Sequence, residues 1–252
     1  MDRWIGKVAV VTGASAGIGA AITEALVKEG LLVVGFARRL EKLKTLSASL
    51  KGAKGKFYVK ECDVTEDQDL LDALKWVEAE FGGIDVMVNN AGVVNATRFL
   101  DDDVASFRNM LNVNFVAGAI AIQVAVASMQ SRKVPGHIIN INSIAGHSIP
   151  AVPINMSAES STKYAVTALT ELVRRELAVT NAKIKITSIS PGNVVGTEIL
   201  EKAGYDSAEL ETLQDLPYIE PKDIANAVVY VLGTPHNVQI TELTIRPLNE
   251  LL

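Results

Sequence analysis

Residues 8–19 read Val-Ala-Val-Val-Thr-Gly-Ala-Ser-Ala-Gly-Ile-Gly. Four consecutive apolar residues are typical of a strand that is buried on both faces of a parallel sheet. The glycines that follow let the backbone turn sharply and approach a ligand closely, and residues 20–29 predict a helix. The free N–H groups at the start of such a helix bind phosphate. The stretch therefore predicts a strand–loop–helix unit for the pyrophosphate of a dinucleotide.

Strand-like and helix-like segments alternate through the rest of the chain. The predicted strands are residues 7–11, 32–36, 56–61, 85–88, 137–141, 185–189 and 242–245. The predicted helices are residues 20–29, 41–50, 67–81, 105–130, 160–179 and 221–232, and residues 197–216 are interpreted as mobile or helical. Strands separated by helices indicate βαβ units. Because no linker divides the chain, we expect one α/β domain over residues 1–252, a Rossmann-like doubly wound parallel sheet of about seven strands with helices on both faces.

The composition disfavours several classes of function. A net charge of -5 disfavours a nucleic-acid partner, which normally meets a basic face. A single cysteine, Cys62, favours a reducing compartment, and no signal peptide is recognisable, so we expect a cytoplasmic protein. The apolar stretch 116–127 is too short to span a membrane. The three histidines are scattered, so no metal site is predicted.

The residues after the second predicted strand bear on the choice of cofactor. Ala37-Arg38-Arg39 stands where a residue that contacts the adenine ribose belongs, and an acidic residue there would bind the 2′-hydroxyl of NAD. Guanidinium groups suit a 2′-phosphate, so NADP(H) is favoured, with Arg38 the stronger candidate and Arg39 the weaker. The alternative is a pair of solvated arginines at the start of a helix.

Further motifs follow the strands in order, and together they resemble the short-chain dehydrogenase/reductase family. They are the T-G-x-x-x-G-x-G loop at 12–19, Cys62-Asp63-Val64, Asn89-Asn90-Ala91-Gly92 and the Pro191-Gly192 turn. The turn that leads to Thr197 is one residue longer than the family's P-G-x-V-x-T. The resemblance implies that NADP(H) is bound by Gly13, Ser15, Ala16, Gly17, Ile18, Gly19, Arg38, Arg39, Asp63, Val64, Asn90, Ala91, Gly92, Lys163, Pro191, Gly192 and Thr197.

The resemblance also assigns catalytic roles. Asn114 matches an asparagine that anchors a water and a helix bend, and Ser143 a serine that hydrogen-bonds the substrate oxygen. Lys163 matches the lysine of the family's Tyr-x-x-x-Lys signature, which binds the nicotinamide ribose and lowers the pKa of the tyrosine. The tyrosine position itself is occupied by Glu159.

Glu159 changes the expected chemistry. A phenol can exchange a proton near neutral pH, whereas a carboxyl group has an ordinary pKa near 4.3 that a neighbouring ammonium lowers further. We therefore expect an ionised Glu159 that forms an i,i+4 salt bridge with Lys163, and a rate reduced by about 10²–10⁴-fold. The less favoured alternative is a dry pocket that keeps Glu159 protonated. Tyr164 should point away from this face and cannot substitute.

The expected substrate is a small apolar alcohol or its carbonyl counterpart. Residues 144–156 and 199–216 should line its pocket, through Ile144, Ile149, Val152, Ile154, Ile199, Leu200 and Leu210. The sequence is similar to an NADP-dependent subgroup of the family that includes insect farnesol dehydrogenases and carbonyl or ketosteroid reductases, so a terpenoid alcohol is one candidate. Two alternatives stay open: a catalytically silent relative that binds NADP(H) or another ligand, and a non-redox use of the same pocket.

The resemblance further implies a homodimer or homotetramer that assembles through helices 105–130 and 160–179. Val166, Leu169, Val173 and Leu177 form an apolar stripe on the second of these helices, and packing in the core explains that stripe equally well.

Overall fold

A computed structural model describes residues 1–149, 155–207, 210–211 and 216–250. Its strands are β1 (Val8–Thr12), β2 (Leu32–Ala37), β3 (Lys56–Glu61), β4 (Val86–Asn89), β5 (Gly136–Ile141), β6 (Ile184–Pro191) and β7 (Glu242–Ile245). They pair in parallel as one seven-stranded sheet in the order β3-β2-β1-β4-β5-β6-β7. The predicted fold is confirmed. The strand order reverses beside β1, and such a switch point opens a crevice for a ligand.

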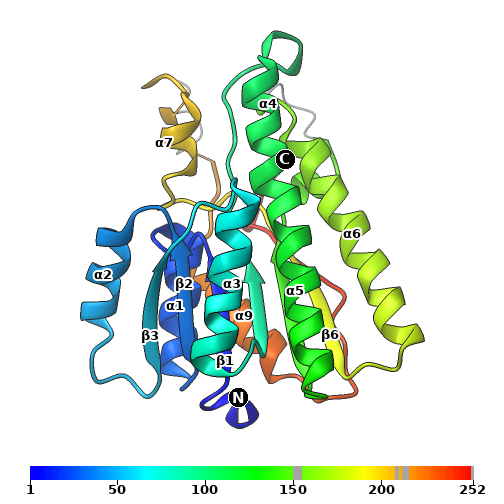
Figure 1. Cartoon of the computed structure of the whole chain (residues 1–252). Helices are drawn as coiled ribbons and strands as arrows, with labels where there is room; N and C mark the ends of the chain where they lie inside the picture. The colour runs from blue at the N-terminus through cyan, green and yellow to red at the C-terminus, as the bar shows by residue number, and fades with distance from the viewer. Residues whose placement is uncertain (150–154, 208–209, 212–215, 251–252) are drawn as a thin grey trace.

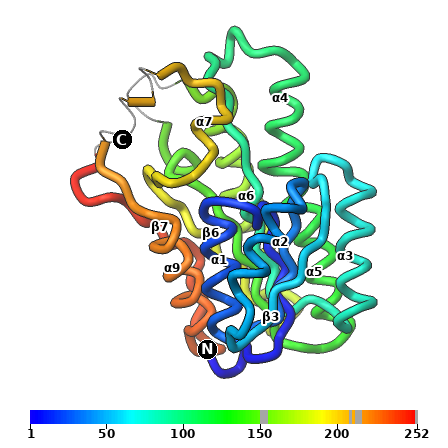
Figure 2. Tube along the Cα trace, turned by 90° about the vertical axis from the view of Figure 1, so that its left-hand side faces the viewer, coloured from blue at the N-terminus to red at the C-terminus, as the bar shows by residue number. Residues whose placement is uncertain are grey.

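Helices cover both faces of the sheet. The described helices are η1 (Asp2–Trp4), α1 (Gly17–Lys28), α2 (Leu40–Ser49), α3 (Asp67–Phe81), η2 (Phe99–Asp101), α4 (Val104–Leu111), η3 (Asn112–Val116), α5 (Ala117–Ser131), η4 (Ile144–Gly146), α6 (Glu159–Val179), α7 (Ile199–Ala203) and α9 (Pro221–Gly233). Figure 1 shows α3 and α5 in front of the sheet, whereas α1 and α9 pack together behind it. Figures 1 and 2 place α4 and α7 beyond the same edge of the sheet.

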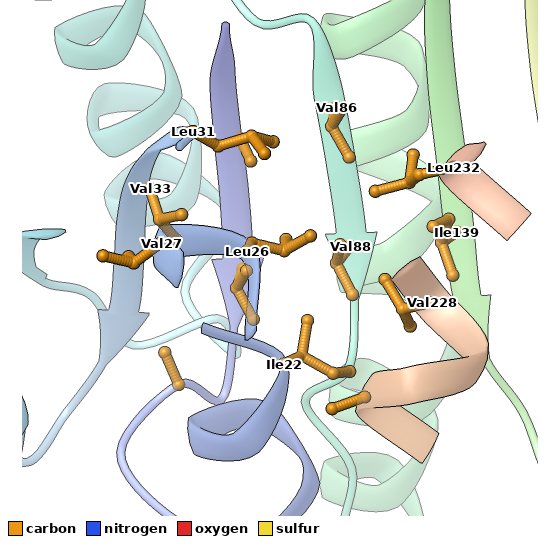
Figure 3. Packing of buried hydrophobic residues seen from close by; sticks show 14 of the residues in the cluster. Ile22, Leu26, Val27, Leu31, Val33, Val86, Val88, Ile139, Val228 and Leu232 are labelled. Atoms are coloured by element: carbon orange, nitrogen blue, oxygen red, sulfur yellow. The ribbon is translucent and has the colours of Figure 1, made fainter. Parts of the chain in front are cut away.

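The core is divided into two layers by the sheet, as the alternation of side chains along a strand requires. Ala9 and Val11 of β1 face the layer that contains α1 and α9, whereas Val8 and Val10 face the layer that contains α3 and α5. Figure 3 shows the first layer, where Ile22 and Leu26 of α1 and Val228 and Leu232 of α9 meet Val86, Val88 and Ile139. The continuous apolar run of β1 is thus explained by burial on both faces.

The helix predicted over residues 105–130 is interrupted. Between α4 and α5 the chain forms a π-helical turn, η3, at Asn112–Val116. The whole run Val104–Ser131 is long and apolar enough to cross a membrane, and an 18-residue window within it has a mean hydropathy of 1.8. One such helix is weak evidence for a span, because the core helices of folded domains share this composition, and α5 packs against α3, β4 and β5. The absence of a membrane span stays a prediction.

The apolar stripe of α6 belongs to the core. Leu177 is buried in the layer with α3 and α5, Leu169 and Val173 pack against that layer, and Val166 is buried. The stripe therefore supports packing within the chain, and the predicted oligomer needs another surface.

Truncation of a core side chain tests this packing. Leu26→Ala should lower the free energy of unfolding by about 2–5 kcal/mol, because Leu26 is fully buried between α1 and the sheet. The matched substitution Leu100→Ala removes a side chain that is 84% exposed and should change stability by less than about 0.5 kcal/mol. Urea unfolding monitored by circular dichroism measures both values, and equal effects of the two substitutions would contradict the assigned core.

Candidate active site

A cleft of about 390 Å³ lies at the carboxyl ends of the strands. Every residue predicted to bind the cofactor lines it, from Gly13 in the first loop to Thr197 after β6. Ser143, Glu159 and Lys163 line the same cleft. The carboxyl ends of the six strands β1 to β6 and the start of α6 thus bring the predicted cofactor residues together with Ser143 and Glu159.

The glycine-rich loop after β1 leaves the N-terminus of α1 open to this cleft. α1 begins at Gly17 with neither a side-chain cap nor an acidic residue in its first turn. Gly13 has φ +67°, and a Cβ on Gly19 would lie 2.4 Å from the carbonyl oxygen of Gly13. The loop therefore needs glycine at both positions, and the free N–H groups beyond it fit an anionic phosphate.

Thr12 and Asn90 hold the loops after β1 and β4 together. The buried Oγ1 of Thr12 accepts hydrogen bonds from the backbone N–H groups of Asn90 at 3.0 Å and Ala91 at 3.1 Å. In return, Nδ2 of Asn90 donates to the carbonyl oxygens of Thr12 at 2.9 Å and Gly13 at 3.4 Å. These bonds fix the backbone of both loops where they line the cleft.

The two candidate arginines have different surroundings. Arg38 is 70% exposed, with a guanidinium nitrogen 3.7 Å from a carboxylate oxygen of Asp63. Arg39 donates to Glu198 at 2.5 Å and to Oγ of Ser15 at 3.1 Å. An exposed ion pair at the distance of Arg38 and Asp63 contributes little, so Arg38 is free to contact an added phosphate group.

Ser143 and Lys163 meet at the end of β5. The hydroxyl of Ser143 accepts a hydrogen bond from the N–H group of Ala145 at 3.1 Å and so caps the short helix η4. Nζ of the buried Lys163 donates to the carbonyl oxygens of Ile141 at 3.2 Å and Asn142 at 3.3 Å. The ammonium group is thus held against the strand end.

Glu159 is the first residue of α6 and is only 6% exposed. Its Oε2 atom is buried without a hydrogen-bond partner in the described part of the chain. The predicted salt bridge with Lys163 is wrong: no ion pair joins the two side chains within the described residues, because the ammonium lies on the backbone carbonyls.

Burial dominates the electrostatics of this pair. It raises the pKa of Glu159, and the nearby Lys163 opposes that rise only in part. Burial likewise lowers the pKa of Lys163, against a smaller opposing effect of Glu159. Lys163 does lower the carboxyl pKa as predicted, but the predicted net shift is wrong in sign, because loss of water disfavours the charged form more strongly.

Asn114 lies behind the cleft wall and not in it. As part of η3, it occupies the expected bend of the helix. Its Oδ1 atom accepts from the N–H group of Val93 at 2.8 Å, and its Nδ2 atom donates to the Val93 carbonyl at 2.9 Å and to Thr162 at 3.2 Å. Asn114 also lines a cavity of about 20 Å³ that is large enough for one water.

The comparisons with known proteins address this arrangement directly. Residues 7–207 match the family model described as short chain dehydrogenase. The chain belongs to the short-chain dehydrogenase family.

Relatives in the short-chain dehydrogenase family cover the whole chain. It is 47% identical over 252 residues to farnesol dehydrogenase from Aedes aegypti, across 99% of each chain. It is 41% identical over 256 residues to dehydrogenase/reductase SDR family member 11 from Bos taurus, across 100% of each chain.

Solved structures of short-chain dehydrogenases share this architecture. A metagenomic short-chain oxidoreductase in complex with NADP superposes with a TM-score of 0.80 at 30% identity, covering 97% of this chain and 98% of that one. A serine dehydrogenase complexed with NADP+ superposes with a TM-score of 0.86 at 29% identity, covering 97% and 96%.

The wall expected for a short-chain dehydrogenase substrate is present in part. Ile144, Ile199 and Leu200 line the cleft, whereas Ile149 is 75% exposed and, like Leu210, does not line it. The predictions for Val152 and Ile154 lie outside the described residues. Tyr164 is 43% exposed and does not line the cleft, as predicted.

Three further residues of the cleft were missed by the sequence reasoning. Tyr205 lines the cleft, and its hydroxyl donates to the carbonyl oxygen of Asn155 at 2.5 Å. Glu198 binds Lys202 and Lys42 as well as Arg39, and hydrogen bonds from these side chains hold its pKa at about 2. No local pattern marks either residue.

Glu250 reaches the cleft from the C-terminal segment. Its carboxylate accepts from the N–H group of Asn193 at 2.7 Å and from Arg246 at 2.7 Å. The side chain is 2% exposed and lies against Gly192, so it supports the turn after β6. The signal that could have revealed it is its acidic side chain in an apolar C-terminal segment, which the sequence alone does not connect to the turn.

Thr12→Val tests the connection between the two loops. The substitution keeps the shape of the side chain but leaves the N–H groups of Asn90 and Ala91 without their acceptor, so the free energy of unfolding should fall by about 1–3 kcal/mol. Thr45→Val, at an exposed helical threonine, should cost less than about 0.5 kcal/mol. Chemical unfolding of both variants measures the difference. A stability of Thr12→Val equal to that of Thr45→Val would show that the hydrogen bonds of Thr12 do not hold the two loops together.

Proposed function

We propose that this chain is an NADP(H)-dependent oxidoreductase that interconverts an apolar alcohol and its aldehyde or ketone. The observation that carries this proposal is one cleft that combines an open helix N-terminus, two arginines and the group Ser143, Glu159 and Lys163. The similarity to a farnesol dehydrogenase and to structures in complex with NADP supports it.

The residues of the cleft fit the proposed cofactor. The uncapped N-terminus of α1 would bind the pyrophosphate, and Gly13 and Gly19 permit the tight turn before this helix, because a Cβ at either position would meet Asn90. Arg38 and Arg39 would bind the 2′-phosphate, and Lys163 would hold the nicotinamide ribose. When bound, the nicotinamide supplies hydride chemistry.

The chain's own residues would act on the substrate oxygen. The Ser143 hydroxyl can donate a hydrogen bond to it, and Glu159 stands where the family's tyrosine exchanges a proton. Ile144, Ile199 and Leu200 form an apolar part of the wall, which favours an apolar substrate such as a terpenoid alcohol. We expect activity below that of a tyrosine variant wherever Glu159 is ionised, because a carboxyl group donates a proton only in its protonated state, whereas a phenol stays protonated across the neutral range.

A catalytically silent relative that binds NADP(H) is the second candidate, and the replacement of the tyrosine by Glu159 is the observation that favours it. Binding of NADPH without turnover of any carbonyl would support this candidate. The assembly into a homodimer or homotetramer stays a prediction, which sedimentation analysis can test. The cytoplasmic location also stays a prediction.

The choice of cofactor can be measured by calorimetric titration. NADPH should bind more tightly than NADH, and Arg38→Ala should weaken NADPH binding by about 10–100-fold while NADH binding changes little, because one charge-assisted hydrogen bond to a phosphate contributes about 1.5–3 kcal/mol. Arg98→Ala removes an exposed arginine outside the cleft and serves as the control. Equal affinities for the two cofactors, or an unchanged preference in Arg38→Ala, would refute this assignment.

The effect of position 159 can be measured by NADPH absorbance with a panel of carbonyl compounds. On the alkaline side of the Glu159 titration, Glu159→Tyr should raise the turnover rate by about tenfold or more, because a phenol still carries its proton there. Tyr164→Phe alters a neighbouring tyrosine that does not line the cleft and should leave the rate unchanged. A chain that turns over rapidly as written, with no gain in Glu159→Tyr, would show that Glu159 imposes no impairment.

A further inference from the structure

We propose that Glu159 acts as a neutral carboxylic acid that donates its proton to the substrate carbonyl oxygen, so that reduction is confined to the acidic side of its titration. This inference rests on the proposed function and deepens it, because one protonation state then sets the direction and the pH range of catalysis.

The position of the carboxyl group favours its neutral form. Glu159 is 6% exposed, and Oε2 is buried without a hydrogen-bond partner among the described residues, although the side chain lines the cleft. A buried carboxylate oxygen without a donor is costly, because nothing replaces the water it has lost. A carboxylic acid in the same place has an O–H group that is available to a ligand in the cleft.

The neighbouring ammonium is directed elsewhere. The ammonium group of Lys163 donates hydrogen bonds to the carbonyl oxygens of Ile141 and Asn142. No ion pair joins it to Glu159 in the described part of the chain. The two backbone carbonyl oxygens are the hydrogen-bond acceptors of this ammonium group. It therefore does not need the carboxylate as a partner.

The other elements packed against α6 bring few charges. η4 and η3 contain no titratable side chain, and α4 contributes Arg108. β6 contributes Lys185, whose ammonium lies on the carbonyl oxygens of Pro235 and Val238. His147, just after η4, faces Ser190 and Glu242. Lys163 is the charge in the described residues that acts on the pKa of Glu159, and burial exceeds its effect.

In the proposed step, proton transfer from Glu159 accompanies hydride transfer to the substrate carbonyl group. The carbonyl carbon receives a hydride, for which reduced nicotinamide is the source, while the carbonyl oxygen takes the proton of Glu159 directly or through one water. The O–H bond of the acid breaks, its electron pair stays on the carboxylate, and the products are an alcohol and oxidised nicotinamide. Water then returns a proton to Glu159. Oxidation of the alcohol requires the carboxylate as the base, so it is favoured above the pKa.

The pH dependence of turnover tests the catalytic role. The rate of NADPH-dependent reduction should fall as the pH rises through the pKa of Glu159, and the rate of oxidation with NADP⁺ should rise over the same interval. Glu159→Gln should lose about 10²–10⁴-fold in reduction and should lack this titration, because an amide has no acidic proton. Circular dichroism and NADPH titration establish that the variant is folded and binds the cofactor. Reduction by Glu159→Gln at the original rate would overturn the proposal.

Infrared spectroscopy of the protein without cofactor tests the protonation state independently of activity. At pH 7 a carbonyl stretch of a protonated carboxyl group should be present in the original chain, absent in Glu159→Gln and retained in Glu24→Gln, where an exposed glutamate is replaced. Absence of this band in the original chain would overturn the proposal.

The pH dependence of the free energy of unfolding also reports the protonation of Glu159. Because the folded-state pKa of Glu159 is raised, its contribution to stability is fully present below the ordinary pKa of about 4.3 and is lost as the pH rises through the folded value. The stability of the original chain relative to Glu159→Gln should therefore fall with rising pH. An invariant difference from pH 4 upward would count against a raised pKa.

The two levels of inference fail in different ways. If Glu159→Tyr reduces carbonyls with NADPH but the original chain lacks the infrared band, the neutral Glu159 acid is refuted and the oxidoreductase function stands. If no variant binds NADPH, the oxidoreductase function falls, and with it the catalytic role proposed for the proton.

Discussion

The arrangement of this molecule depends on a parallel sheet that is buried on both faces. Because the side chains of β1 alternate between two apolar layers, polar groups find places mainly at the strand ends. The carboxyl ends of β1 and β4 are joined there by Thr12 and Asn90, which satisfy each other's backbone groups. The cleft is therefore shaped by backbone held from within the fold, and Gly13 and Gly19 let the two loops approach each other closely beside Asn90.

Local pattern was sufficient for most of the sheet and insufficient for the bend between α4 and α5. The segments 56–61 and 242–245 were predicted as strands and match the bounds of β3 and β7. The π turn η3 depends on Asn114, whose amide binds Val93. A tertiary contact of this kind leaves no periodic signal, so the apolar pattern predicted one continuous helix, and only the resemblance to the family implied a bend at Asn114.

Some residues of the candidate site could be predicted from sequence motifs, and others could not. The motif residues that follow strands could be predicted, because strand order and direction bring every strand end to one edge. Glu250 could not, since it reaches the cleft from a segment remote in sequence, and Glu198 and Tyr205 lie beside or within predicted segments but carry no motif that marks them. The i,i+4 spacing of Glu159 and Lys163 suggested a salt bridge, but spacing does not fix the direction of a flexible lysine, and the carbonyl oxygens of Ile141 and Asn142 supply other acceptors.

In the role proposed for it, Glu159 would support the chemistry of the family's tyrosine by a different physical route. A phenol is neutral at pH 7 by its own chemistry and needs a neighbouring ammonium to become a useful acid. A carboxyl group is neutral at that pH only where water is excluded, against both the nearby ammonium and the N-terminal dipole of α6. Its usefulness as a proton donor therefore depends on the dryness of the cleft, to which side chains such as Tyr205, next to α7, contribute. The proton transfer that we propose would thus depend on the solvation of a single carboxyl group.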